Sequence, residues 1–262
     1  MATMSHSLLS LLLSFPFFFL GGNSTTFTIL NQCDYTVWPG LLSGAGTSQL
    51  STTGFVLEKG QSNPITIPPG WSGRIWGRTY CSHDATGRFT CATADCGSGT
   101  VECNGKGAVP PATLAEFTLN GANGLDFYDV SLVDGYNVPM LITPQDGTGG
   151  GNCTTTGCAT DLNSECPSEL RVAASDGNEK SVASSNPACP QAYSYAYDDG
   201  TSTFTCTAAN YLITFCPLSD RNAQSPKGVD SSRTERSGRP SLIVAVISMV
   251  MAALSQQFLF LF

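Results

Sequence analysis

Hydrophobic residues recur in short runs along this chain, and no long stretch repeats them at helical spacing. Each run is rich in β-branched or aromatic residues and is bounded by Gly, Pro, Asn or Asp, which is typical of strands joined by tight turns. The runs are residues 25–30, 35–38, 72–78, 113–119, 127–133, 201–205 and 211–215. This pattern predicts an all-β fold, either a sandwich or a barrel.

Two finer expectations follow from the same pattern. Residues 113–119 alternate in polarity, and we expect Glu116 and Thr118 to share a strand face opposite Leu114. Residues 147–158 and 164–186 are rich in Thr, Ser, Gly and Asn, so we expect loops there, with at most one short helix near residues 169–174.

The first 24 residues are typical of a signal peptide. An apolar run at residues 8–20 precedes the small residues 21–24, although the start of the chain lacks Lys and Arg. We therefore expect a mature chain that begins near Thr25, in an oxidising compartment.

The C-terminal end is also apolar. Residues 218–240 are a polar linker, and residues 241–262 form a hydrophobic tail whose longest uninterrupted apolar stretch is shorter than the roughly 20 residues of a spanning helix. Small residues, a spacer and an apolar tail favour a glycolipid (GPI) anchor signal, with attachment at Ser231. A tail-anchored helix, a shifted reading frame and a retained intron are the alternatives.

Charge and histidine content exclude several functions. The chain has 12 Lys and Arg against 20 Asp and Glu, a formal charge of −8, which disfavours nucleic-acid binding. Of its two His residues, His6 lies in the expected signal peptide, so His83, to which we assign no role, is the only imidazole left. A zinc site of several His is excluded, and we expect no metal and no cofactor. Carboxylates must carry any chemistry.

The chain contains eleven Cys, an odd number, so at least one thiol has no partner within it. In an oxidising compartment the others predict disulfides, although spacing alone does not fix their pairing. The sequence at Asn152 is an acceptor site for N-glycosylation, with a Cys at its central position.

Four of the cysteines lie in or beside one segment, residues 81–103, whose part from 87 to 103 reads GRFTCATADCGSGTVEC. Residues 87–103 match along their length the signature of the thaumatin-like family, which includes osmotin and the group-five pathogenesis-related proteins, and the chain resembles that family. Residues 71–79, 111–119, 125–135, 189–199 and 214–217 resemble the family in the same order. The resemblance covers about residues 25–217 and implies a flattened β-sandwich with loop lobes stapled by disulfides.

The resemblance also implies a disulfide pairing: Cys33–Cys216, Cys81–Cys91, Cys96–Cys103, Cys153–Cys206 and Cys158–Cys189. Family members usually have sixteen Cys, and the five absent here belong between Cys166 and Cys189. Cys166 is therefore expected to be unpaired, in a disulfide-rich lobe at about 147–210 that is truncated around 167–188. A natural deletion, an alternatively spliced form and a gene-model error all remain open.

The family has an acidic cleft whose charged positions match Arg74, Glu116, Asp129, Asp134 and Asp198. Glu116 and Asp129 are the candidate catalytic acid and base, with Arg74 holding a carboxylate ionised. In the structural alternatives, Arg74 only ties strand ends together, and the two other Asp residues are turn residues. The alternating residues Tyr193, Tyr195 and Tyr197 favour core packing over stacking against sugar.

The resemblance implies a secreted or cell-surface plant defence protein, a monomer, that binds fungal-wall β-1,3-glucan through the acidic cleft. The first alternative is a weak endo-β-1,3-glucanase. A shortened lobe disfavours it, because catalysis tolerates less positional slack than binding. A surface-anchored recognition module and a non-functional truncated isoform are further alternatives.

Overall fold

The computed structural model describes residues 24–147, 153–165, 172–173, 179–180, 189–194 and 199–218. The chain divides into two compact units, Met1–Ser219 and Asp220–Phe262, and all of the second lies outside the described residues. The expected signal peptide up to residue 23, the linker from residue 219 and the apolar tail also lie outside them. So do Asn152, Cys166, Tyr195, Tyr197, Asp198 and Ser231.

The first sheet has five strands in the order β3-β1-β13-β8-β9. Their bounds are β1 Thr25–Asn31, β3 Ser62–Ile67, β8 Met140–Gln145, β9 Thr156–Cys158 and β13 Asn210–Phe215. Strands β1 and β13, from opposite ends of the domain sequence, pair in parallel, and the other neighbours are antiparallel. The first and last strands therefore lie side by side in the middle of this sheet.

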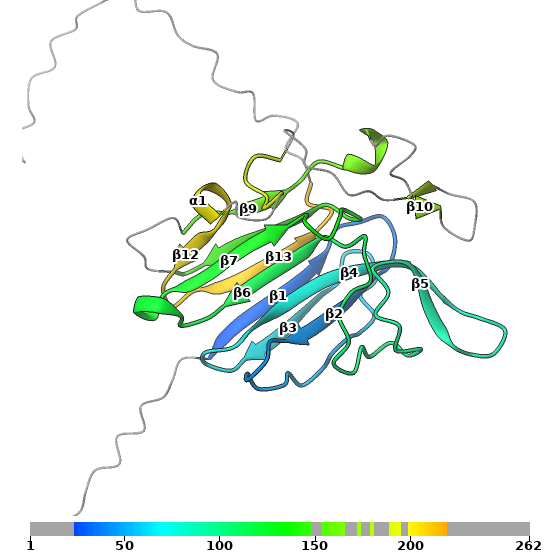
Figure 1. The fold of residues 1–262 in the computed structure, drawn as a ribbon, viewed down its shortest axis with the longest axis horizontal. Coiled ribbons are helices and arrows are strands. Elements are labelled where there is room, and N and C mark those ends of the chain that lie inside the picture. The colour runs from blue at the N-terminus through cyan, green and yellow to red at the C-terminus, as the bar shows by residue number, and fades with distance from the viewer. Residues whose placement is uncertain are drawn as a thin grey trace, which may run out of the picture. The chain divides into compact units, whose positions relative to one another are not determined.

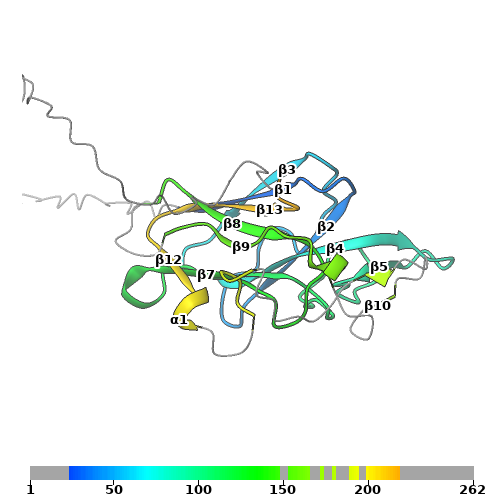
Figure 2. The ribbon, with the colours of Figure 1, turned by 90° about the horizontal axis from the view of Figure 1, so that it is seen from above.

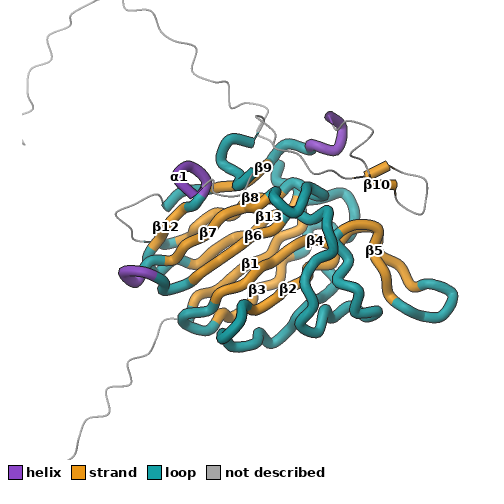
Figure 3. The backbone as a smooth tube through the Cα atoms, in the orientation of Figure 1, coloured by secondary structure: helices purple, strands orange, loops and turns teal. Residues whose placement is uncertain are grey.

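The second sheet has six strands, in the order β12-β7-β6-β4-β2 with β5 paired to β4. Their bounds are β2 Val37–Ser43, β4 Ser72–His83, β5 Phe89–Thr93, β6 Leu114–Thr118, β7 Asp126–Ser131 and β12 Phe204–Cys206. The two sheets overlap in Figure 1, and Figure 2 shows them from the side as stacked layers. Figure 3 shows how much of the described chain is strand.

The remaining described elements are short. Strands β10 Val172–Ala173 and β11 Glu179–Lys180 form a separate two-stranded ribbon. The helical turns are η1 Ala122–Gly124, η2 Leu162–Glu165 and α1 Asp199–Ser202. No helix among the described residues is long and apolar enough to cross a membrane. The fold is therefore the all-β sandwich that the sequence predicts.

The main core lies between the two sheets. Phe27 of β1 packs on Phe117 of β6 with ring centroids 4.3 Å apart, and Tyr211 of β13 packs on Tyr128 of β7 at 5.2 Å. All four rings are at most 4% exposed. A second cluster around Trp76, Cys96, Cys103 and Leu114 lies on the other face of the second sheet. Burial of these apolar surfaces on both sides holds that sheet in place.

Five disulfides join described cysteines: Cys33–Cys216, Cys81–Cys91, Cys96–Cys103, Cys153–Cys206 and Cys158–Cys189. These are the pairs that the family resemblance implies. Cys33–Cys216 closes a sequence separation of 183 residues and fastens the end of β1 to the end of β13.

Several finer expectations were wrong. Leu114 lies on the Glu116 face rather than opposite it, because residues two apart on a strand share a face and Leu114 is covered there by Trp76. The expected strand 201–205 begins as the helical turn α1, and only β12 is extended. The loop expected at 147–158 ends in β9, and Val172–Ala173, in the expected helix 169–174, pairs with β11 as a strand.

Candidate functional site

Three of the charged residues form a row across the second sheet. Arg74 of β4 is directly opposite Glu116 of β6, which is directly opposite Asp129 of β7. The residues beside them in each strand, such as Ile75, Ala115 and Val130, are buried in the core between the sheets. Because side chains alternate along a strand, the charged row projects from the outer face of the sheet.

Arg74 and Glu116 form an ion pair, with Arg74 Nε 3.0 Å from Glu116 Oε1. The side chains are 50% and 32% exposed, so the pair is partly screened by water and contributes little to stability. Its effect is to fix the direction of the Glu116 carboxylate. The row therefore offers both hydrogen-bond donors and acceptors on one surface.

The pKa of Glu116 is raised above its ordinary value. Burial is the largest cause, the Arg74 guanidinium opposes it, and the negative charge of Asp134 adds to it. Asp134 itself lies in a turn closed by a hydrogen bond from the Gly135 amide to the Leu132 carbonyl, 3.0 Å. It is thus a turn residue, as one alternative had it, and also an electrostatic neighbour of Glu116.

The row borders a groove of about 270 Å³. Besides Arg74, Glu116 and Asp129, its walls are formed by Gly44, Ser72, Gly73, Phe117, Thr118 and Phe127. A Cβ added at Gly73 would collide with the Leu42 carbonyl and the Trp71 ring, so glycine is required for this close approach. The groove thus combines carboxylates, a guanidinium, hydroxyls and a half-exposed phenyl ring.

Ser72 and Phe127 were not considered from the sequence, and Thr118 was expected to share the Glu116 face, as it does, but was not a candidate site residue. Each lies two positions from a charged residue of the row, on the same strand: Ser72 from Arg74, Thr118 from Glu116, and Phe127 from Asp129. Alternation along three strands places them on the same outer face. That spacing was the signal that could have found them.

Directly paired residues of antiparallel strands have Cβ atoms about 4.5–5.5 Å apart. Glu116 and Asp129 are such a pair, and glycosidases hold their two carboxyl groups about 5–10 Å apart. The row therefore contains two neighbouring carboxyl groups, the pair of groups that glycoside hydrolysis uses. Among the described residues, no group of three His, Cys, Asp or Glu could hold a metal ion.

Tyr193, and His83, to which the sequence assigned no role, contact other parts of the fold. Tyr193 is half-buried, and its backbone pairs with Val130 and Leu132, so it extends the edge of β7. His83 ends β4, where its ring meets that of Phe89 at 5.4 Å. Neither residue lines the groove.

The sequence of this chain matches a protein-family model and several known proteins. A family model described as "Thaumatin family" matches residues 31–187 and 177–217. A PR5-like receptor kinase of Arabidopsis thaliana is 45% identical over 277 residues, covering 92% of this chain but 42% of the kinase. That alignment is longer than the 262 residues of this chain, so the relative contains residues without a counterpart here.

Two relatives align over most of their own length. A glucan endo-1,3-beta-glucosidase of Prunus avium is 48% identical over 230 residues, which is 76% of this chain and 93% of that protein. The pathogenesis-related thaumatin-like protein 3.5 of Cryptomeria japonica is 49% identical over 225 residues, which is 75% of this chain and 91% of that protein.

Proposed function

Because this chain belongs to the thaumatin family, we propose that it is an exported plant defence protein that binds β-1,3-glucan of fungal walls in the groove beside Arg74, Glu116 and Asp129. The observation that carries the proposal is the cross-strand row of these three residues on the outer face of the second sheet. The defence role is supported by the name of the Cryptomeria relative.

The chemistry of the groove favours an uncharged polysaccharide. Carboxylates accept hydrogen bonds from sugar hydroxyls, and the guanidinium of Arg74 donates to them. The Phe127 ring offers an apolar surface for the C–H face of a sugar. The net charge of −8 repels anionic polymers over longer distances, so a neutral glucan fits better than a charged one.

The test is retention on insoluble β-1,3-glucan. We expect Glu116→Gln to weaken retention about fivefold to tenfold, which corresponds to about 1–1.4 kcal/mol, the net contribution of about one hydrogen bond. Glu58→Gln is the matched control, because Glu58 is exposed and does not line the groove. Wild-type protein that is not retained, or equal retention of all three proteins, would show the proposal to be wrong.

Weak endo-β-1,3-glucanase activity is the second candidate. The raised pKa of Glu116 suits a general acid, Asp129 beside it suits a base or nucleophile, and the Prunus relative carries the name of such an enzyme. The measurement is the release of reducing ends from soluble β-1,3-glucan. Activity that Asp129→Asn abolishes while glucan binding persists would establish it, and a flat time course for wild type would dismiss it.

The shortened lobe is part of the proposal. The two family matches overlap at residues 177–187, and the receptor kinase has residues without a counterpart here, which supports a missing piece around residues 167–188. Loss of that piece removes part of the cleft wall. It also removes the cysteine with which the counterpart of Cys166 pairs in the family. It weakens catalysis more than binding, since enzymes hold their carboxylates within about 0.5 Å of productive geometry.

Export and anchoring complete the proposal. Five disulfides fit an oxidising compartment, and the chain would reach that compartment through a leader that ends near residue 24. A glycolipid anchor attached at Ser231 would hold the protein at the outer face of the plasma membrane, where it could also serve as a recognition module. Phospholipase release from membranes would support the anchor, and retention after treatment would favour a tail-anchored helix.

A further inference from the structure

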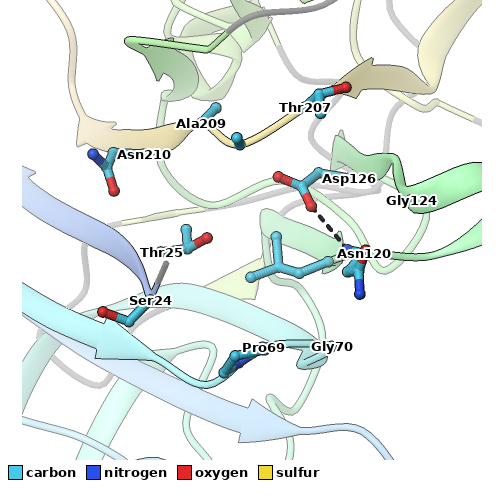
Figure 4. Close-up of a pocket in the computed structure, with 12 residues that line it drawn as sticks. Ser24, Thr25, Pro69, Gly70, Asn120, Gly124, Asp126, Thr207, Ala209 and Asn210 are labelled. Atoms are coloured by element: carbon cyan, nitrogen blue, oxygen red, sulfur yellow. Dashed lines mark hydrogen bonds between the residues drawn. The ribbon is translucent and has the colours of Figure 1, made fainter. Parts of the chain in front are cut away.

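A second pocket, larger than the groove, opens at one end of the sandwich and has a volume of about 590 Å³. Figure 4 shows its walls, which come from the start of β1, the β3–β4 turn, the β6–β7 turn and the β12–β13 connection. Its lining includes Thr25, Asn120, Asp126, Thr207 and Asn210. None of them lines the groove.

Asp126 gives this pocket a buried negative charge. The residue is only 6% exposed, and its carboxylate accepts hydrogen bonds from the Asn120 amide, 2.8 Å, and the Tyr211 hydroxyl, 2.9 Å. The nearby titratable groups are the phenols of Tyr211 and Tyr128, and burial raises the pKa of both, so both stay neutral. Asp126 thus has neutral hydrogen-bond donors but no cation among the residues lining the pocket.

A buried carboxylate without an opposite charge is costly, and a cation in the pocket would offset that cost. The other polar wall groups suit an ammonium ion in particular, since Asn120, Asn210 and Thr207 all carry oxygen acceptors. An anion is excluded by the charge of Asp126. The lining contains no aromatic ring, which disfavours a sugar.

The start of the described chain forms part of the same pocket. Thr25 begins β1 and pairs with Ile67 of β3, and the Thr26 amide donates to Asn210 Oδ1 at 2.8 Å. The chain is therefore held on both sides where it leaves the pocket wall. Residue 24 is also where the expected leader ends.

We propose that the α-ammonium group which leader removal creates at Thr25 binds in this pocket and neutralises Asp126. The proposal rests on the export proposed above. A signal peptidase would hydrolyse the bond before Thr25: water adds across it, the leader keeps the new carboxylate, and Thr25 keeps the new amine, which is protonated at neutral pH. Leader removal thus fastens the start of β1 to the β6–β7 turn and β13.

The experiment begins with the exported full chain, whose intact mass identifies its first residue. Reductive methylation with ¹³C-formaldehyde then labels the α-amine without removing its charge, and its NMR shift is followed against pH. We expect this amine to hold its proton about tenfold more tightly than an ordinary α-amine, whose pKa is about 7.7–8.0. Asp126→Asn should abolish that difference, whereas Tyr211→Phe, which keeps the carboxylate, should preserve it.

The outcomes separate this proposal from the others. If the wild-type chain begins at Thr25 and its α-amine has an ordinary pKa, the proposed binding of this amine is wrong, although export still holds. This measurement uses the wild-type protein alone, so it does not depend on a variant that folds. A chain that keeps its leader, or that begins well away from Thr25, would overturn leader removal and this proposal together. Loss of glucan retention alone would concern only the groove.

Discussion

Arg74, Glu116 and Asp129 lie side by side because three strands from different parts of the chain are paired in one register. At the level of single residues, the consequence is a carboxyl group, that of Glu116, whose pKa is set by its burial and by two charged neighbours. Burial and the charge of Asp134 disfavour the ionised form of Glu116, and Arg74 favours it. Each of the two charges can be removed by one substitution, so the direction of its effect on the pKa can be checked.

We expect the pKa of Glu116, followed by ¹³C NMR of its carboxyl group, to lie above the ordinary range. Arg74→Met should raise that pKa further, because it removes the opposing charge, and Asp134→Asn should lower it. If the two variants shift the pKa in the same direction, this electrostatic description is wrong.

The same pKa has a consequence for stability. A group whose pKa is raised in the folded state contributes stability below its unfolded pKa, and this contribution is lost as the pH rises through the folded value. The stability of Glu116→Gln relative to wild type should therefore increase as the pH rises through the pKa of Glu116. Urea unfolding at pH values below and above that pKa measures the difference.

At the scale of the element, the groove depends on how closely β4 approaches its neighbours. Gly73 allows this approach, since a side chain there would meet the Leu42 carbonyl of β2 and the Trp71 ring. Cores tolerate added atoms poorly, because the surroundings must shift to admit them. Strand β4 also carries Arg74, so a displacement at Gly73 would be transmitted to the charged row.

We therefore expect Gly73→Ala to cost about 1–3 kcal/mol of unfolding free energy and to weaken glucan retention. Gly107→Ala is the matched control, because its Cβ would meet only Leu42 Cδ2, at an ordinary 3.5 Å. Urea unfolding of both variants makes the comparison. Equal costs for the two substitutions would show that close packing at Gly73 is not what positions β4.

The elements also show what the sequence can and cannot predict. Strands with β-branched or aromatic residues, such as β1, β6 and β13, are found from their composition. Strands β3 and β8 were missed because each contains a proline, Pro64 and Pro144, and proline argues against a strand. Strand β9 was missed because it is only three residues long. At residues 201–205 the Thr residues suggested a strand throughout, but local turn formation at Asp199–Ser202 prevails.

The charged row required more than local pattern. Alternation predicts which face of a strand a residue occupies, but it does not say which residues of β4, β6 and β7 are opposite one another. Family resemblance supplied the candidates Arg74, Glu116 and Asp129, and the register is visible only in the structure. The pocket at Asp126 had no sequence signal, because its walls come from the start of β1 and three connections that are distant from one another in the chain.

At the scale of the whole molecule, the two ends of the domain are joined twice. Strands β1 and β13 pair in parallel, and Cys33–Cys216 links their ends covalently. In the chain-entropy account, a disulfide stabilises by restricting the unfolded chain, and the effect grows with the length of the closed loop. Cys33–Cys216 closes 183 residues, whereas Cys81–Cys91 closes only 10.

Replacing both cysteines of Cys33–Cys216 by Ala should therefore lower the free energy of unfolding by about 4–5 kcal/mol, and the same change at Cys81–Cys91 by about 2–3 kcal/mol. Urea unfolding of the two double variants, with the other bridges intact, gives the comparison. A larger loss at Cys81–Cys91 would mean that local geometry outweighs loop closure in this domain.

Binding of β-1,3-glucan to the outer face of the second sheet can be mapped residue by residue by NMR. The backbone amide shifts of isotope-labelled protein are recorded while a soluble β-1,3-glucan oligosaccharide is added. We predict saturable shifts centred on Arg74, Glu116 and Asp129, with the β12–β13 connection at residues 207–210 unaffected. Shifts centred on another face, or no shifts at a high concentration of oligosaccharide, would show that the outer face of the second sheet does not bind β-1,3-glucan.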